Sequence, residues 1–391
     1  DKEMQQFEAD LLQSVRQMKK REFARTTKVN VTEVARARID AGFSQNAFAK
    51  LMGVSVRTLQ EWEQGRRAPT GAAQTLLASV YMVLKKWDDA AKVAEAVIND
   101  ANKYQYALVK DYNSLWDADL GFQSEHVWVV DFLGGITGEN ASNQDYTAPM
   151  TGVRDADMLG WSVIVPSNGM YASFSDLDPR KKISFLTETP VKGVMTPYEQ
   201  WKWPRIHTAK WCLHPGTNAG ADGSDSDIKH VIFRYAEVLL MAAEALNESK
   251  GGPTDKALSY INAVRARARY TPQGIQSYPA DLPVDMTQDA FRKAVQEERR
   301  VELAFEGFRY FDVLRWGTAI IELNHTFTGV KLSDDPSAPN FRGSGSTASP
   351  VDENMYYQFE ERSWSAHNRY FPIPQYDLNI NENLKQNEGY N

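Results

Sequence analysis

Aromatic rings that could bind a sugar are concentrated in the middle of the chain. Sugars present flat C–H faces ringed by hydroxyl groups, so a receptor needs exposed aromatic planes beside amide, carboxylate or guanidinium groups. The alternative is that these rings fill a core, because aromatic side chains also dominate core burial. The candidates for sugar contact are Trp161, Tyr171, Trp201, Trp203, Trp211 and Arg205, with Asn140, Asn143 and Asn218 nearby in the sequence.

Three carboxylates in a glycine-rich loop, Asp222, Asp225 and Asp227, could bind a calcium ion. A hard cation prefers oxygen ligands, and a flexible loop can wrap them around it. The alternative is an ordinary solvated acidic loop. The six His and one Cys of the chain show no metal-ligand spacing. We therefore expect no cofactor other than, at most, this Ca²⁺.

Polar side chains suited to DNA lie near the front of the chain. Two short helical patterns, 44–52 and 55–64, each begin at a serine, which favours helix N-termini, and Gly53-Val54 joins them as in a helix-turn-helix. A helix across the major groove needs short polar, amide or guanidinium side chains to reach base edges, and flanking cations meet phosphates. The alternative is a small solvated bundle. The candidates for DNA contact are Gln45, Ser55, Arg57, Thr58, Gln60, Arg66 and Arg67.

A long helical pattern at 288–316 is rich in charge. Its charged residues include Glu298, Arg299, Arg300, Glu302, Glu306, Arg309 and Arg315. Carboxylates of this kind could serve acid–base chemistry or metal ligation. However, an arginine lies near every one of them, the charged residues stand at spacings that allow i,i+3 and i,i+4 pairs, and no His completes a ligand set. We interpret the pattern as a buried or half-buried ion network.

Nothing else in the sequence indicates catalysis. The glycine-rich run at 134–140 lacks the lysine and serine of a phosphate-binding loop. No nucleophile is spaced with a base and an orienting group. The single cysteine, Cys212, excludes an internal disulfide and is expected to be an inert small residue. We therefore expect a binding protein and not an enzyme.

The charge distribution divides the chain into two parts. Residues 1–75 hold 13 Lys and Arg against 9 Asp and Glu, whereas the remainder holds 31 against 42. This asymmetry favours a nucleic-acid partner for the basic part only. No apolar run is long enough to cross a membrane, and residues 1–30 lack the apolar stretch of a signal peptide. We expect two domains, 1–75 and 76–391.

The sequence of the second part, 76–391, predicts a mainly α-helical fold. Small and apolar residues on one stripe predict helix pairs at 75–101 and 234–269. The distance between the pairs far exceeds the tetratricopeptide period of about 34 residues, so we expect a tetratricopeptide-like scaffold interrupted by a loop-rich insertion at 103–229. Without preceding repeats, Val80, Leu84 and Val93 should be left uncovered. The fold class is thus mainly α, with an all-α helix-turn-helix module in front.

The N-terminal part of the sequence resembles a known family. The string GFSQNAFAKLMGVSVRTLQEWEQGRRAPTGAAQTLL resembles Xre/HigA-type helix-turn-helix regulators and antitoxins. The matching features are the SQ helix start, the A-x-x-x-G turn, the VSVRTLQEWEQGRR segment and Pro69. The resemblance covers about residues 1–77 and implies sequence-specific DNA binding.

The remainder, about residues 75–391, carries a second resemblance. RYAEVLLMAAEALNE, ALSYINAVRARA, ERRVELAFEGFRYFDVLRWG and the ending YFPIPQYDLNINENLKQNEGY are together similar to SusD/RagB-family proteins. Asp178-Pro179-Arg180 fits the family's DPR turn, and the run 125–128 fits its E-x-[IV]-W-like strand. The resemblance implies a non-catalytic outer-membrane lipoprotein that captures glycans or other nutrients for a SusC-type TonB-dependent transporter.

The two resemblances imply incompatible cellular locations. Nutrient capture belongs on the outer membrane, whereas DNA binding belongs in the cytoplasm. Family members of the second kind also begin with a signal peptide and a lipidated cysteine, where this chain has a helix-turn-helix. Two hypotheses therefore remain, a glycan-binding body and a DNA-binding regulator, and a fused or chimeric chain joined near 75–77 accounts for both.

Overall fold

The computed structural model describes residues 2–19, 31–135, 145–158, 160–201, 204–219, 225–323, 326–330, 356–361, 364–381 and 383–390. It divides into two compact units, 1–68 and 69–391. Residues 69–75 were expected in the front module. They belong to the second unit because they open helix α5 (Gly71–Val83), which runs through the expected boundary without a break.

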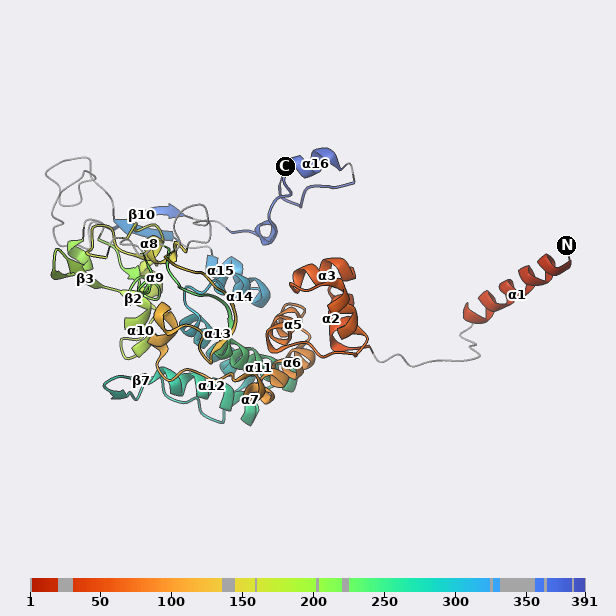
Figure 1. The fold of residues 1–391 in the computed structure, drawn as a ribbon, viewed down its shortest axis with the longest axis horizontal. Helices are drawn as coiled ribbons and strands as arrows, with labels where there is room; N and C mark the ends of the chain where they lie inside the picture. The colour runs from red at the N-terminus through yellow and green to blue at the C-terminus, as the bar shows by residue number, and fades with distance from the viewer. Residues whose placement is uncertain are drawn as a thin grey trace. The chain divides into compact units, whose positions relative to one another are not determined.

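The first unit contains the expected helix-turn-helix. Its helices are α1 (Lys2–Lys19), α2 (Glu33–Asp40), α3 (Gln45–Leu51) and α4 (Val56–Glu63) (Figure 1). Ser44 and Ser55 cap α3 and α4, since each hydroxyl accepts a hydrogen bond from a backbone N–H in the first turn. Gly53 adopts a φ of +64°, which lets the chain turn between them. The buried side chains include Val34, Ala35, Ala37, Phe48, Ala49, Met52, Leu59 and Trp62.

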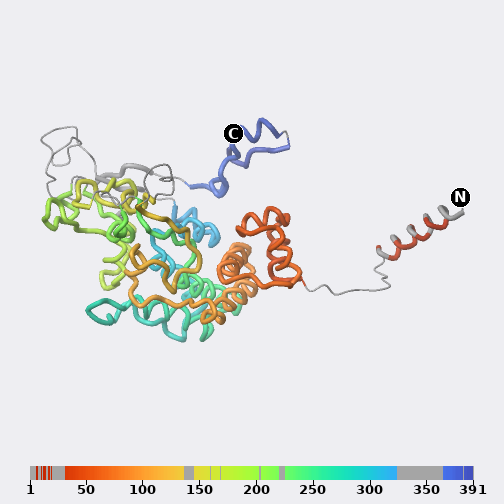
Figure 2. Tube along the Cα trace, viewed as in Figure 1, coloured from red at the N-terminus to blue at the C-terminus, as the bar shows by residue number. Residues whose placement is uncertain are grey.

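The second unit is built on packed helices, as the helix pairs predicted. They are α5, α6 (Trp87–Asn99), α11 (Tyr235–Lys250), α12 (Asp255–Ala268) and α13 (Gln288–Glu302). Helix α6 packs against α5 and α11, and α11 also packs against α12 and α13 (Figure 2). Buried alanines on α6 and α11, such as Ala90 and Ala243, permit this close approach. The expectation that Val93 is uncovered was wrong, because it is 2% exposed, and Val80 and Leu84 are half-buried.

The long helix expected at 288–316 is broken. Helix α13 ends at Glu302, and α14 (Arg309–Trp316) begins after a turn in which Phe305 and Gly307 have positive φ angles of +69° and +87°. Positive φ is incompatible with a right-handed helix. The charge pattern continues through the turn because residues on both sides of it face the same ion network.

The insertion consists of short elements joined by loops, as expected. Its helices are α7 (Ala101–Tyr104), α8 (Thr147–Thr151), α9 (Asn168–Ala172) and α10 (Pro179–Ser184), and 3-10 turns occur at Tyr112–Trp116, Ala118–Leu120 and Tyr198–Gln200. The antiparallel pairs are β1 (His126–Val130) with β6 (His230–Arg234), β2 (Phe185–Leu186) with β5 (His207–Thr208), and β3 (Glu188–Val191) with β4 (Val194–Pro197). The strand that the resemblance implied at 125–128 is therefore present as β1.

The remaining elements lie toward the C-terminus. They are β7 (Tyr270–Thr271) with β8 (Gly274–Ile275), α15 (Ala319–Leu323), β9 (Thr326–Val330) with β10 (Tyr356–Glu361), the 3-10 turn Ala366–Arg369 and α16 (Gln375–Ile380). Across the described ranges, no helix has both the length and the apolar character needed to span a bilayer.

A buried ion network ties the insertion to the helices. The Arg234 side chain is fully buried, and its guanidinium group contacts Glu125 at 2.7 Å, Glu302 at 2.6 Å and Glu306 at 2.7 Å. Burial raises the pKa of Glu302, but three guanidinium groups lower it by more, so this pKa lies well below its usual range. These carboxylates are structural, because each forms a buried ion pair with an arginine.

The same network extends to the DPR turn. Arg180, which is 1% exposed, donates to Glu298 at 2.6 Å and Glu302 at 2.8 Å, and pairs with Asp178 at 2.8 Å. The ion-network interpretation of the sequence is thus confirmed for the inward-facing residues. Arg300 is different, since it pairs with the half-exposed Glu297 on the surface.

Candidate functional site

Two aromatic rings form an exposed platform on the insertion. Tyr146 is 41% exposed and Trp161 is 38% exposed. Their ring centroids lie 5.7 Å apart, with an angle of 32° between the ring planes. Of the predicted sugar contacts, Trp161 therefore has the exposure that stacking requires, whereas Tyr146 was not among the candidates. We call this pair the Tyr146–Trp161 platform.

A network of hydrogen bonds fixes the Tyr146 side of the platform. Asp145 is 4% exposed, and its carboxylate accepts hydrogen bonds from the Thr147 N–H at 3.1 Å and from the Ser226 hydroxyl at 2.8 Å. Thr147 opens α8, so the carboxylate satisfies a donor at the start of that helix. The ring of Tyr146 is thus presented from a short helix with an anchored N-terminus.

Backbone contacts place Trp161 against the other end of the same helix. The Trp161 N–H donates to the Pro149 carbonyl at 2.7 Å. Just before it, Gly160 packs directly on Gly152, and a Cβ atom added at Gly160 would lie 2.1 Å from the Gly152 carbonyl carbon. Only glycine permits this approach, because real Cβ contacts are never that short. The chain therefore brings Trp161 to Tyr146 through a glycine–glycine contact.

A buried histidine supports the residue that follows the tryptophan. His207 is fully buried, and its Nε2 lies 2.9 Å from Ser162 Oγ while its Nδ1 lies 2.8 Å from the Arg205 carbonyl oxygen. Burial lowers the pKa of His207 to about 4. The imidazole is therefore neutral at pH 7. Arg205, another predicted sugar contact, is exposed. Its backbone carbonyl bonds the same imidazole that bonds Ser162, the residue after Trp161.

Polar groups gather on the Asp145 side of the platform. The backbone N–H of Asp225 donates to the Asp145 carbonyl at 3.1 Å. Asp227 accepts from the Gly134 N–H at 2.5 Å and from the Asn218 side-chain amide at 2.6 Å. The segment 225–227 is thus hydrogen-bonded to Asp145, the residue that precedes Tyr146.

The calcium hypothesis has no complete ligand set among the described residues. Asp222, Asn140 and Asn143 lie outside them. Both carboxylate oxygens of Asp227 already accept hydrogen bonds. Within the described ranges, no group of three or more His, Cys, Asp or Glu residues is arranged to hold a metal ion.

The other predicted rings lie elsewhere. Trp201 is 2% exposed, and its indole N–H donates to the Thr196 carbonyl at 2.8 Å, so the expectation that it offers a face to a sugar was wrong. Trp211 is half-buried edge-on against Trp116. Tyr171 is half-buried, packing edge-on against Phe185 with the Lys181 ammonium 4.2 Å from its ring centre. Trp203 lies outside the described residues.

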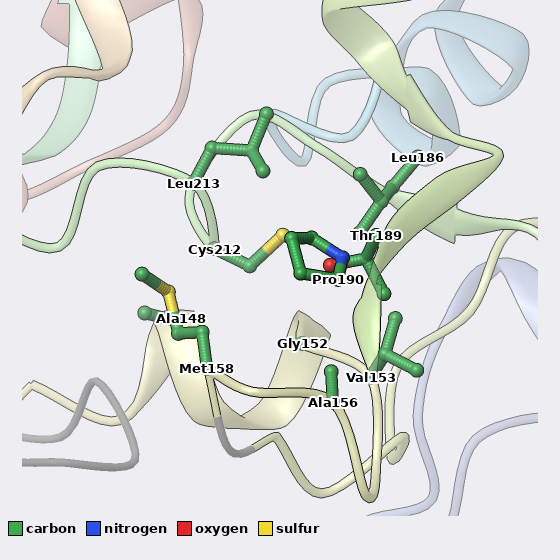
Figure 3. A pocket seen from close by; sticks show the side chains of 10 residues that line it. All are labelled: Ala148, Gly152, Val153, Ala156, Met158, Leu186, Thr189, Pro190, Cys212 and Leu213. Carbon is green, nitrogen blue, oxygen red and sulfur yellow. The ribbon is translucent and has the colours of Figure 1, made fainter. Parts of the chain in front are cut away.

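An apolar cavity of 280 Å³ lies beside α8 (Figure 3). One wall comes from the segment that supports the platform, with Ala148, Gly152, Val153, Ala156 and Met158, and the other walls come from Leu186, Thr189, Pro190, Cys212 and Leu213. Burial raises the pKa of the Cys212 thiol to about 12, which fits the inert role expected for this residue. The side chains that line the cavity are apolar apart from Thr189, so the cavity suits an apolar group.

The predicted DNA contacts differ in their availability. The Arg57 side chain is 90% exposed, and Arg66 and Arg67 are also exposed. Ser55 uses its hydroxyl to cap α4, and Thr58 is half-buried beside it.

The two glutamines are partly engaged within the unit. Gln45 donates to Glu63 at 2.7 Å and accepts from Gln60 at 3.2 Å, while Arg38 pairs with Glu63 at 2.5 Å. Burial raises the pKa of Glu63, but the hydrogen bonds from Arg38 and Gln45 outweigh it and leave the pKa lowered. Each glutamine therefore keeps only part of its hydrogen-bonding capacity for DNA.

Comparison with known proteins identifies relatives of both units. The sequence model of the SusD family matches residues 186–390, and a helix-turn-helix model matches residues 34–81. SusD-like protein P2 of Formosa agariphila is 36% identical over 270 residues, which cover 66% of this chain and 52% of that protein. Antitoxin HigA-2 of Vibrio cholerae is 42% identical over 52 residues, which cover 13% of this chain and 50% of that protein.

The fold is also shared with solved structures. A SusD-like carbohydrate-binding protein from Bacteroides fragilis superposes with a TM-score of 0.63 at 24% identity, covering 88% of this chain and 71% of that one. The chain spans about half the length of the curated SusD-like relatives it matches.

Proposed function

Since this chain belongs to the SusD family, whose model matches residues 186–390, we propose that its second unit binds oligosaccharides without transforming them. The observation that carries the proposal is the exposed Tyr146–Trp161 platform. Two rings inclined by 32° can follow the curved faces of neighbouring sugar residues. The structural relative from Bacteroides fragilis is described as a carbohydrate-binding protein, which supports the ligand class.

We propose further that the second unit acts at the cell surface and delivers its ligand to a SusC-type transporter. This proposal rests on family membership. The non-catalytic character is supported by the ion network, which engages the most deeply buried carboxylates of the scaffold in arginine pairs.

The first unit supports a second function, sequence-specific DNA binding. Its helix-turn-helix match and the exposed cations Arg57, Arg66 and Arg67 favour it. One such unit makes few phosphate contacts, so we expect weak binding as a monomer and tighter binding only as a dimer across two half-sites.

A direct experiment separates the two functions on one sample. The full chain is titrated with a panel of oligosaccharides by calorimetry and with a duplex DNA library by gel shift at low salt. The variant Tyr146→Ala should weaken sugar binding and leave any gel shift unchanged, whereas Arg57→Ala should do the reverse. Absence of binding to every sugar in the panel, with the chain folded by circular dichroism, would refute the glycan proposal.

A further inference from the structure

The apolar cavity beside α8 lies next to the aromatic platform. Gly152 lines the cavity and also forms half of the glycine–glycine contact that positions Trp161. Ala148 lines it two residues after Tyr146, and Met158 lines it three residues before Trp161. Since successive Cα atoms are about 3.8 Å apart, these lining residues lie within about 8 Å and 11 Å of the two platform residues. A substituent on a sugar stacked at the platform is therefore within reach of the cavity.

The cavity has a buried apolar interior and an exposed rim. Met158 and Leu213 are 42% and 39% exposed, whereas Val153, Leu186 and Cys212 are buried. The volume of 280 Å³ exceeds the roughly 150 Å³ of an apolar cavity that binds benzene. The cavity can therefore admit an apolar group of several carbon atoms.

Hydrogen bonds hold two walls of the cavity together. The Asp157 N–H donates to the Pro190 carbonyl at 2.9 Å. The Asp157 carboxylate accepts from the backbone N–H groups of Lys192 at 2.6 Å and Gly193 at 2.8 Å. These bonds join the segment 153–158 to the hairpin of β3 and β4, so the cavity is already formed without a ligand, as ligand pockets usually are.

Thr189 places one polar group inside this apolar lining. The residue is 6% exposed, and its hydroxyl oxygen points into the cavity (Figure 3). The Thr189 backbone pairs with Thr196 in the β3–β4 hairpin, but within the described ranges the Thr189 hydroxyl has no hydrogen-bond partner. Buried polar groups are nearly always hydrogen-bonded in folded proteins, so this hydroxyl is available to one ligand atom.

An ester-linked acyl group matches both features of the cavity. Its carbonyl oxygen can accept a hydrogen bond from the Thr189 hydroxyl, and its alkyl carbons can pack against Leu186 and Pro190. An amide-linked acyl group would also bring an N–H, for which the lining offers no second polar side chain. A sugar ring would leave several hydroxyl groups buried without partners, which costs free energy.

We propose that the cavity binds an ester-linked acyl substituent of the oligosaccharide held at the platform. The inference rests on the proposed glycan binding and makes acylated oligosaccharides the preferred ligand class. Each further methylene placed in the cavity should raise the affinity about fourfold, so a butyryl ester should bind more tightly than an acetyl ester.

Calorimetry on the full chain tests the acyl site. The best-binding oligosaccharide of the panel is compared with its mono-O-acetyl and mono-O-butyryl regioisomers, and we expect at least one butyryl regioisomer to bind at least tenfold more tightly than the parent sugar. Thr189→Val removes the hydroxyl, and Ala156→Leu fills the cavity. Both should reduce this gain to less than threefold and leave the affinity for the parent sugar unchanged. The matched control is Thr196→Val, which lies opposite Thr189 in the hairpin, does not line the cavity, and should keep the gain.

A probe without a sugar separates the acyl site from the proposed function. Saturation-transfer NMR should detect binding of methyl butyrate to the wild type and to Trp161→Ala, but not to Ala156→Leu, with melting temperatures checked for all three. Equal affinity of the parent sugar and every acylated regioisomer, or methyl butyrate binding that survives Ala156→Leu, would overturn the proposal. Binding of methyl butyrate as expected, without binding of any sugar, would support the acyl site and refute the proposed function.

Discussion

His207 accepts a hydrogen bond from the Ser162 hydroxyl, one residue after the exposed Trp161, with 2.9 Å between Nε2 and Oγ. The direction follows from the neighbouring bonds. The Arg154 N–H donates to Ser162 Oγ at 2.9 Å, and only a protonated Nδ1 of His207 can bond the Arg205 carbonyl oxygen. Nε2 is therefore the acceptor. The platform thus depends on a neutral imidazole.

Acid should weaken both the fold around the platform and sugar binding. The pKa of His207 is about 4 in the folded chain against 6.5 as its ordinary value, because burial disfavours the charged form. Between these values the unfolded chain binds more protons, so the contribution to stability is present above pH 6.5 and is lost as the pH falls toward 4. We expect sugar affinity, measured by calorimetry, to fall in the same window.

Ser162→Gly provides the control for this pH dependence. Ser162 has a φ of +53°, which glycine adopts without strain, so the variant removes the hydroxyl and little else. It should bind more weakly at pH 7 and respond less to acid. If wild type and Ser162→Gly lose affinity in parallel between pH 6.5 and 4, the hydrogen bond between Ser162 and His207 does not carry the pH dependence.

Gly160→Ala should disrupt the platform from its backbone. The new methyl group would meet the Gly152 carbonyl carbon at 2.1 Å, and backbone cannot yield as a flexible side chain does. We expect loss of sugar binding and a destabilisation of about 1–3 kcal/mol, typical of overpacking in a well-packed core. The matched control is Gly169→Ala, where an added Cβ meets nothing within 4 Å. Equal effects of the two substitutions on binding would contradict the role of the glycine–glycine contact.

Arg234→Met should be among the most damaging changes in the second unit. It removes one buried partner from each of Glu125, Glu302 and Glu306, which keep Arg267, Arg180 and Lys210, and breaking a buried pair costs about 3–5 kcal/mol. Tryptophan fluorescence during urea unfolding reports mainly on this unit, because Trp62 is the only tryptophan before residue 69. Arg300→Met, at a surface pair, should change stability by less than about 1 kcal/mol. Similar midpoints for both variants would refute the structural role of the network.

Arg57→Ala should weaken DNA binding by about 1–3 kcal/mol if the side chain contacts a base in bidentate fashion. The fold of the first unit should persist, because this side chain is 90% exposed. Fluorescence anisotropy with a selected duplex measures the loss. A variant that binds every duplex as the wild type does would exclude Arg57 from the interface.

Local patterns in the sequence predicted most of the helices and the charge network. The serine caps, the glycine turn at Gly53 and the alanine stripe of α6 are set by neighbours in the chain, so they could be read directly. The break between α13 and α14 could not, because residues before and after it satisfy one ion network and keep a helical charge pattern. Arg234 and Glu302 are far apart in the sequence, so spacing along the helix could not identify them as partners.

The site was harder to predict than the fold. Exposure of a tryptophan depends on contacts made across the chain, so Trp161 and Trp201 were equivalent in the sequence but differ in the structure. Tyr146 was missed because its partner stands fifteen positions away in a loop. The two glycines, Gly152 and Gly160, were the available signal, since glycine pairs can mark close backbone contact.

The most direct test of the central claim is the affinity of Trp161→Ala for the oligosaccharide that binds best in the panel, measured by calorimetry beside its thermal melting. The matched control is Phe311→Ala, an exposed aromatic residue of the same unit that lies outside the platform. We predict that Trp161→Ala loses about 2 kcal/mol or more of binding free energy at an unchanged melting temperature, as central aromatic anchors do, and that Phe311→Ala binds like the wild type. Wild-type affinity for Trp161→Ala, or a loss of affinity accompanied by a fall of several degrees in melting temperature, would contradict the account.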